Sequence, residues 1–193
     1  MGLRIVFVRH GLSSFNKKGL IQGRTNDSYL TEEGYRQAEL AGNVLKQINF
    51  HEIISSPLIR ASETAKAIEK CFENEYQINF NKKLLEVDLD CWSGLRPDEI
   101  KDKHPNSYKI WKTNPENLSI RRSDNSQFHP IKELYKQAEE FLNDLLDRYD
   151  PQDNINILVI AHNAILRCLI LHLIDKPDKG FRKIKLDNAS ISI

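Results

Sequence analysis

Two short apolar segments of this chain each end at a histidine, and this repetition constrains the fold more than any other feature. The first segment, 3–8, is followed by Arg9 and His10, and the second, 155–161, is followed by His162. Apolar runs of this length are typical of the buried strands of a parallel sheet. Because ligands bind beyond the carboxyl ends of such strands, we expect both histidines at one edge of the sheet.

The remaining sequence alternates strand-like and helix-like segments. We expect strands at 52–55, 77–80, 184–186 and 190–193, and helices at 31–48, 59–75, 130–149 and 164–174. Strands that alternate with helices are typical of a largely parallel sheet covered on both faces. The sequence therefore predicts an α/β fold, a three-layer α/β/α arrangement with a mostly parallel central sheet, in a single domain spanning 1–193.

Residues 97–129 interrupt this alternation. They break into short helical pieces and polar loop, and such an excursion inside a compact domain is either a functional lid or surface decoration. We interpret the segment as a lid-like insert. It carries Arg121, Arg122 and His129, which either face solvent or contact a substrate.

The overall charge excludes several classes of partner. The 193 residues include 28 Lys and Arg against 27 Asp and Glu, so the chain has no global basic field to attract nucleic acid or a membrane surface. The apolar segment 155–174 has the length of a membrane span. However, it contains His162 and Arg167, and its pattern changes midway from strand to helix. Because the overall charge is balanced, any anion-binding site must depend on a local group of cationic residues.

Cysteine usage is typical of a reducing compartment. Cys71, Cys91 and Cys168 are odd in number and widely spaced, and they form no CxxC motif. Neither a disulfide framework nor a zinc site is indicated, so we expect reduced, mostly buried thiols in the cytoplasm. Since no other cluster has metal-ligand spacing, we expect neither a metal nor a cofactor.

A serine-rich turn leads from the strand at 52–55 into a helix that Pro57 helps to begin. Arg60 then lies in the first helical turn, where backbone N–H groups and the helix dipole favour an anion. A cation is unfavourable there unless an anion compensates it, and the candidates are a bound phosphate and Glu63. The alternative interpretation is an Arg60–Glu63 surface pair, which contributes little stability.

Glu86 is the candidate proton donor. Its apolar neighbours predict partial burial, and burial raises the pKa of a carboxyl group in general, as a general acid at neutral pH requires. Asp88 and Asp90 are rivals on the same segment, and an alternating edge strand with its acidic face in water is an alternative. Beside the second histidine, Asn163 is expected to cap the following helix.

These segments, in this order, resemble the signatures of the histidine phosphatase superfamily, which includes the cofactor-dependent phosphoglycerate mutases. The resemblance spans nearly the whole chain. It rests on Val8-Arg9-His10-Gly11 with Asn16, on Gln22-Gly23 followed by Leu30-Thr31, Gly34 and Gln37-Ala38, on Ser55-Ser56-Pro57 through Arg60-Ala61 and Thr64-Ala65, and on Ala161-His162. Other segments, among them Glu86-Val87-Asp88-Leu89 and His129-Pro130-Ile131, look similar to 2-carboxy-D-arabinitol-1-phosphatase-like proteins.

The resemblance implies a role for each matching residue. His10 is the phosphorylated nucleophile and Glu86 is the proton donor. The groups that hold the phosphoryl oxygens are Arg9, Arg60 and His162. Further substrate contacts are expected from Asn16, Gln22, Gly23 and Asn163.

This chain departs from many relatives at three positions. Leu85 stands where they have Arg, and Asp90 and Asn163 stand where glycine is usual. These departures leave the phosphate pocket intact and bear on how the leaving group is recognised.

The resemblance implies a metal-independent phosphomonoesterase. We expect it to hydrolyse a small phosphorylated metabolite, a sugar phosphate or sugar-acid phosphate, through a phosphohistidine intermediate. One alternative is mutase-type phosphoryl transfer, but the chain is short relative to mutases and lacks a long basic tail to close the pocket. Another is an inactive domain that binds a phosphorylated ligand, which would need neither a nucleophile nor a proton donor. The sequence leaves open a homodimer.

Overall fold

A computed structural model describes residues 2–122, 124–150, 152–176 and 180–193. At its centre lies a five-stranded sheet in the order β3-β2-β6-β1-β7. The strands are β1 (Arg4–Arg9), β2 (Glu52–Ser55), β3 (Ile78–Phe80), β6 (Asn156–Ala161) and β7 (Ile191–Ser192). The first four of these are parallel, and β7 runs antiparallel to β1 at one edge.

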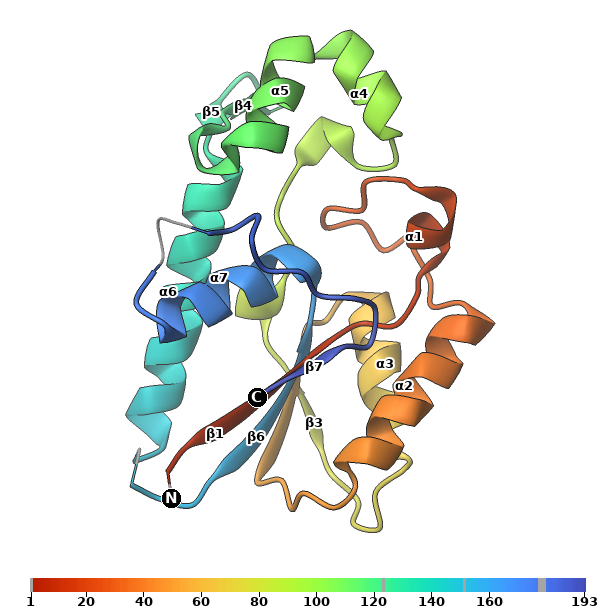
Figure 1. Cartoon of the computed structure of the whole chain (residues 1–193), viewed down its shortest axis with the longest axis vertical. Coiled ribbons are helices and arrows are strands. Elements are labelled where there is room, and N and C mark those ends of the chain that lie inside the picture. The colour runs from red at the N-terminus through yellow and green to blue at the C-terminus, as the bar shows by residue number, and fades with distance from the viewer. Residues whose placement is uncertain (1, 123, 151, 177–179) are drawn as a thin grey trace.

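Helices cover both faces of the sheet (Figure 1). The helices α2 (Glu32–Leu45) and α3 (Ile59–Glu69) pack on one face, and α6 (Pro130–Arg148) and α7 (Asn163–Leu173) pack on the other. Since side chains alternate along a strand, Val6 and Val8 join the core beneath the first pair of helices and Phe7 joins the core beneath the second. The predicted three-layer α/β/α fold with a mostly parallel sheet is confirmed.

The register of the two central strands sets the position of the two histidines. The parallel pairing of β1 and β6 runs from Arg4 opposite Asn156 to Arg9 opposite Ala161. The ladder continues one step further, because the backbone N–H of His10 donates to the carbonyl of Ala161 at 2.9 Å. The strands β1 and β6 therefore both end at the carboxyl edge of the sheet.

Several short elements lie near this edge. They are α1 (Ser14–Lys18), the 3₁₀ turns η1 (Lys82–Leu84), η2 (Asp90–Trp92) and η3 (Pro115–Asn117), the helices α4 (Pro97–Lys103) and α5 (Pro105–Thr113), and the hairpin of β4 (Ile120–Arg121) and β5 (Gln127–Phe128). Figure 1 shows α4, α5 and the hairpin together at one end of the molecule. Trp92 is buried in the core, and the ring of Trp111 meets it edge-to-face at 6.4 Å between centroids.

Most expected helices form within a few residues of their predicted bounds. The side chain of Thr31 caps α2 by accepting a hydrogen bond from the N–H of Gly34. The helix expected at 59–75 ends at Glu69 instead, because the chain turns so that the N–H groups of Cys71 and Phe72 reach carbonyls three residues back. This turn lets the Phe72 ring stack on Phe50 at 5.7 Å between centroids.

The late edge strands form only in part. Of 190–193, Ile191 and Ser192 make β7, but 184–186 is not a strand. The carbonyl of Leu186 instead accepts hydrogen bonds from the side chains of Arg9, at 2.7 Å, and Asn163, at 3.5 Å. The Leu186 carbonyl is therefore bonded to side chains rather than to a neighbouring strand.

The apolar segment 155–174 divides into β6 and α7, as its change of pattern predicts. No helix in the described part of the chain is both long enough and apolar enough to cross a membrane.

The cysteines are less buried than expected. Cys168 lies in the core, but Cys71 is half-buried and Cys91 is exposed. The prediction of mostly buried thiols is therefore wrong for two of the three. Both of these lie at turns, Cys71 just after α3 and Cys91 within η2.

Candidate active site

His10 follows β1 and is almost fully buried, with 1% of its surface exposed. Its Nδ1 lies 2.8 Å from the carbonyl oxygen of Gly11. A carbonyl can only accept, so Nδ1 carries the proton and Nε2 keeps a free lone pair. Burial lowers the pKa of His10 well below the ordinary histidine value, and the charges of Arg60 and Arg9 lower it further. His10 is therefore a neutral imidazole with a nucleophilic nitrogen.

His162 packs against His10, with 5.2 Å between ring centroids and 57° between ring planes. Its Nε2 lies 2.7 Å from the hydroxyl oxygen of Ser56, which follows β2. Its Nδ1 is buried and has no hydrogen-bond partner among the residues that the structure describes. Burial, followed by the charge of Arg60, lowers the pKa of His162 well below its usual range. The ends of three neighbouring strands thus meet at these two rings.

Arg60 lies in the first turn of α3 and is fully buried. It donates through Nη1 to the carbonyl of Thr25 and through Nη2 to that of Gly23, both at 2.8 Å. Its buried Nε has no acceptor in the described ranges. Burial is the main cause that lowers the pKa of Arg60 to about 10; the charge of Arg9 also lowers it, whereas that of Glu86 raises it.

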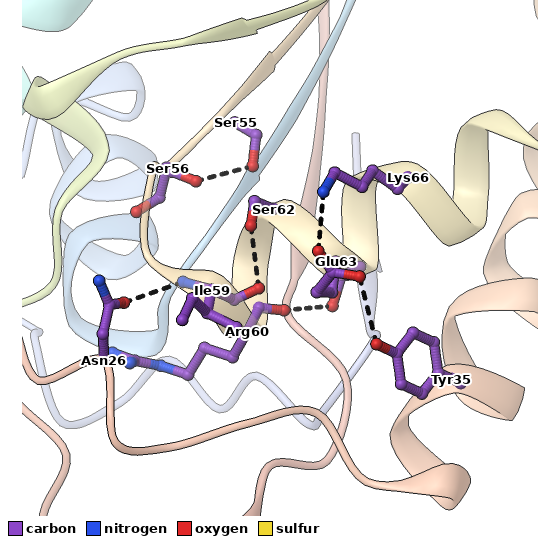
Figure 2. Close-up of polar contacts among 10 residues, drawn as sticks. Asn26, Tyr35, Ser55, Ser56, Ile59, Arg60, Ser62, Glu63 and Lys66 are labelled. Carbon is purple, nitrogen blue, oxygen red and sulfur yellow. Dashed lines mark hydrogen bonds and ion pairs between the residues drawn. The ribbon is translucent and has the colours of Figure 1, made fainter.

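The alternative surface pair of Arg60 with Glu63 is wrong. Figure 2 shows the two side chains leading away from each other. Glu63 instead pairs with Lys66 at 2.8 Å and accepts a hydrogen bond from the hydroxyl of Tyr35 at 3.2 Å. The guanidinium of Arg60 points toward the loop that contains Asn26 (Figure 2). Among the described residues, Arg60 therefore has no carboxylate in hydrogen-bonded contact.

Arg9 reaches the same region from the end of β1. Its Nη1 donates to the carbonyl of Leu186 at 2.7 Å, while its buried Nε lacks a partner within the described ranges. Burial lowers the pKa of Arg9, the nearby Glu86 raises it, and Arg167 lowers it again. Arg9 and His10 line the same cavity, and the charges of Arg9 and Arg60 both lower the pKa of His10. Buried N–H groups without acceptors are rare in proteins, and a cluster of them is suited to an anion.

Glu86 lies on a loop rather than on the alternative edge strand, since residues 85–89 form no strand. Glu86 is buried, with 9% of its surface exposed. One carboxylate oxygen accepts the N–H groups of Val87 at 2.8 Å, Ala164 at 3.1 Å and Ile165 at 3.3 Å. Glu86 therefore caps α7, which is a charge-assisted contact with the positive end of a helix dipole.

The expected cap of α7, Asn163, is the first residue of the helix instead. His162 occupies the N-cap position and makes no capping hydrogen bond through its side chain. Because Glu86 comes from a distant part of the chain, the sequence next to the helix cannot reveal it. Asn163 donates to the carbonyl of Leu186 at 3.5 Å.

A cavity of about 280 Å³ opens beside these groups. Seven of the predicted site residues line it: Arg9, His10, Asn16, Gln22, Gly23, Glu86 and Asn163. Arg60 and His162 are fully buried and adjoin the site through His10. The two acidic rivals, Asp88 and Asp90, are not among the residues that line this cavity.

The loop that follows β1 is held by hydrogen bonds within the loop and from Asn188. Asn188 donates through Nδ2 to the carbonyls of His10 and Gly11 and to Oδ1 of Asn16, at 3.0, 3.2 and 3.1 Å. Gln22 accepts the hydroxyl of Ser13 at 2.8 Å. The predicted site residues on this loop therefore have hydrogen-bond partners from other parts of the chain that position them.

Gly23 and Asp90 both adopt left-handed backbone conformations. Gly23 has φ of +52°, and a Cβ there would lie 2.5 Å from Oγ of Ser93. Asp90 has φ of +42°, in the region that favours glycine, so the glycine of the resembling family suits this backbone. The departure at Asp90 therefore changes the side chain without changing the turn.

The three basic residues of the insert lie elsewhere in the structure. Arg122 pairs with Glu133 at 3.2 Å and stacks over the ring of Phe128 at 4.0 Å. His129 lies at the N-cap of α6, with Nδ1 3.1 Å from the carbonyl of Leu118. Arg121 is an exposed residue of β4. None of the three lines the cavity among the described residues.

The cavity is lined instead by further residues to which the sequence analysis gave no role in the site, among them Trp111, Arg167, Phe181 and Arg182. Arg167 lies one turn into α7, four residues after Asn163 and on the same helix face, so its spacing from that predicted site residue could have indicated it. Trp111 belongs to α5 and lines the cavity, so one residue of the insert does reach the site. Phe181 and Arg182 lie on an irregular turn and carry no local signal.

Comparisons with known proteins agree on one family. Residues 5–193 match the histidine phosphatase superfamily, branch 1. A probable 2-carboxy-D-arabinitol-1-phosphatase of Arabidopsis thaliana is 33% identical over 98% of this chain, which spans 37% of that relative's length. Phosphoserine phosphatase 1 of Hydrogenobacter thermophilus is 26% identical, over 99% of this chain and 85% of its own.

A solved structure extends the comparison to the fold. The phosphoserine phosphatase of Entamoeba histolytica, in complex with 3-phosphoglyceric acid, superposes with a TM-score of 0.79 at 27% identity. The match covers 98% of this chain and 88% of that one. Since the family match extends over nearly every residue, from β1 through β7, this chain belongs to the histidine phosphatase superfamily.

Proposed function

We propose that this protein is a phosphomonoesterase that hydrolyses a small phosphorylated metabolite through a phosphohistidine on His10. The observation that carries the proposal is the neutral imidazole of His10, surrounded by cationic groups whose buried N–H donors lack protein acceptors. These donors are the Nε groups of Arg9 and Arg60, and Nδ1 of the His162 ring is a third buried nitrogen without a partner among the described residues. A phosphoryl group carries concentrated negative charge and can accept all of these contacts.

In the first step, Nε2 of His10 attacks phosphorus and the bond to the ester oxygen breaks. Because phosphoryl transfer has a loose transition state, the protein mainly positions the group and neutralises its charge. Arg60 supplies that neutralisation from a fully buried position and Arg9 from a half-buried one whose Nε is buried, and charges act strongly where water is excluded. The lone pair of Nε2 is available for the attack because the Gly11 carbonyl holds the proton on Nδ1.

Glu86 supplies the proton in the proposed mechanism. It lines the same cavity as His10, so a leaving oxygen bound there is within its reach. In the second step, Glu86 takes a proton from water, whose oxygen forms a bond to phosphorus as the bond to His10 breaks. Inorganic phosphate is released, and the free imidazole is restored.

The family comparisons support the reaction class, and the cavity supports the size of the substrate. The relatives named above are phosphatases of a sugar acid phosphate and of phosphoserine. A cavity of about 280 Å³ lies at the small end of the range for ligand sites, which suits a metabolite rather than a phosphoprotein. We therefore propose a sugar phosphate or sugar-acid phosphate as the substrate class.

The direct test is to trap the covalent intermediate. Protein mixed with a ³²P-labelled phosphomonoester and quenched in alkali should retain label, because a phosphoramidate survives base and is lost in acid. His10→Ala should remain unlabelled and release no phosphate from p-nitrophenyl phosphate. Wild-type protein that neither labels nor releases phosphate would overturn the proposal in favour of a binding domain. If 2- and 3-phosphoglycerate interconvert faster than phosphate is released, the activity is that of a mutase.

A further inference from the structure

The cavity beside His10 contains a second group of cations that the proposed hydrolysis does not use. Arg167 on α7 and Arg182 on the following turn both line it. Their guanidinium carbons lie 5.3 and 5.9 Å from the centroid of the Phe181 ring. Arg182 also stacks over Trp111 at 4.6 Å and donates a hydrogen bond to its carbonyl. We call these four residues the Phe181 cluster.

The charges of the Phe181 cluster are only partly compensated by the protein. Burial lowers the pKa of Arg182, and the charge of Arg167 lowers it further, while Glu116 raises it. Burial also lowers the pKa of Arg167, which Glu86 raises. Neither arginine forms an ion pair within the described ranges, and the buried Nε of Arg167 has no acceptor there.

The carboxylate of Glu86 is shared among several cations. It raises the pKa of Arg9, Arg60 and Arg167 alike, although its own hydrogen bonds go to backbone N–H groups. One carboxylate thus lies near three guanidinium groups, of which Arg9 and Arg167 line the cavity, and Arg182 adds a further cation to the cavity lining. A phosphoryl group held by Arg9 and Arg60 leaves Arg167 and Arg182 for a second anionic group.

We infer that the Phe181 cluster binds a carboxylate of the substrate, so that the substrate is the phosphate ester of a small hydroxy acid. This inference rests on the proposed function and narrows its substrate class. Guanidinium forks match the two oxygens of a carboxylate, and the rings of Phe181 and Trp111 hold both forks in position before the ligand arrives. The volume of the cavity suits a small molecule that spans both anion sites.

The test compares two esters that differ in one group, 3-phosphoglycerate and glycerol 3-phosphate. The first has a carboxylate where the second has a hydroxymethyl group. Wild-type protein should prefer 3-phosphoglycerate by at least about 10-fold in kcat/KM, mostly through KM, because charge-assisted hydrogen bonds are lost with the alcohol. In Arg182→Gln this preference should fall by about 10-fold.

Arg122→Gln is the matched control. Arg122 also stacks on a phenylalanine ring and faces carboxylates, but it lies outside the cavity. The ratio of the two kcat/KM values should stay at its wild-type value in this variant. An equal fall in Arg122→Gln and Arg182→Gln would mean that the ratio reports overall charge, which would overturn the inference.

Binding measurements separate this inference from the proposed hydrolysis. Calorimetric titration of His10→Ala with each ester gives affinities without turnover. Tighter binding of 3-phosphoglycerate than of glycerol 3-phosphate, lost on adding Arg167→Lys or Arg182→Gln, supports a carboxylate site even if the wild type releases no phosphate. Equal affinities for the two esters overturn the inference, and phosphate release from both esters at equal rates would leave the phosphatase activity standing without it.

Discussion

Glu86 and Ala164 lie 78 residues apart in the chain, yet the backbone N–H of Ala164 reaches both carboxylate oxygens of Glu86, at 3.1 and 3.2 Å. Ala164 is in the first turn of the helix that follows His162. The proposed proton donor is therefore anchored to the same helix that begins at the second histidine. One contact holds the acid and the phosphate pocket in fixed relation.

Glu86→Gln should reduce activity by about 10²–10⁴-fold, because the amide cannot protonate a leaving oxygen. It can still accept N–H groups through its carbonyl oxygen, so α7 should remain capped. The loss should be larger for an alkyl phosphate than for p-nitrophenyl phosphate, whose leaving group needs little protonation. Rates of phosphate release for both esters measure this. The control is Asp88→Asn, which should keep most activity, and equal losses in the two variants would contradict the role of Glu86.

Stability should fall as the pH drops below about 6.5, the ordinary pKa of histidine. The pKa values of His10 and His162 are lowered in the folded state, so below that pH the unfolded chain binds protons that the folded protein does not. The stability present above the unfolded pKa is then lost toward the folded values, with a slope of about 1.4 kcal/mol per pH unit for each ring.

Urea denaturation at intervals between pH 7.5 and pH 5 measures this slope. The window lies above the usual carboxylate range, so the two rings dominate it. In His162→Gln the slope should fall to about half that of the wild type. A free energy of unfolding that stays constant across the window would show that the rings are not held neutral.

Gly23→Ala should destabilise the protein and weaken substrate binding. The added Cβ would require a left-handed conformation and would lie 2.5 Å from Oγ of Ser93. The backbone cost alone is about 1–2 kcal/mol. Movement of the Gly23 carbonyl would also disturb Nη2 of Arg60, so KM for p-nitrophenyl phosphate should rise.

Gly19→Ala is a matched control for this change. Gly19 has φ of +68°, but a Cβ there meets no atom within 4 Å. Gly19→Ala should lose the stability that the left-handed backbone costs an alanine, but it should add no steric clash. Its KM should equal that of the wild type. Thermal melts and steady-state kinetics of the two variants separate strain from the effect on Arg60, and an unchanged KM in Gly23→Ala would contradict the coupling.

Activity should persist in EDTA at the rate seen without it. In the proposed mechanism the positive charges of Arg9 and Arg60 stabilise the transferring phosphoryl group. The measurement is phosphate release from p-nitrophenyl phosphate after dialysis against chelator, with and without added magnesium. A strict requirement for magnesium would contradict this prediction.

The sequence predicted the parts of the site that depend on local pattern. Apolar runs identify β1 and β6, and since parallel strands end at one edge, His10 and His162 could be expected to meet. The position of Arg60 in the first turn of α3 followed from Pro57 in the same way. Each of these inferences needs only the residues within one element and the rule for parallel sheets.

Contacts between distant segments could not be predicted in this way. The cap of α7 comes from Glu86 rather than from Asn163, because side-chain reach across the fold decides it. The cations that line the cavity include Arg182 rather than Arg122, although both lie outside the helices and strands. Folding places one beside Trp111 and the other beside Glu133.

The pairing of β1 carries a consequence for how the catalytic groups stay assembled. Alternate residues of a strand face opposite layers, so a slip of a single residue past β6 would turn the His10 imidazole away from His162. On its other side β1 is clamped by β7 and by the N–H of Arg9, which donates to the Ser190 carbonyl at 3.2 Å. The short strand β7 therefore helps to hold the register of β1 that places His10, the proposed nucleophile, beside His162.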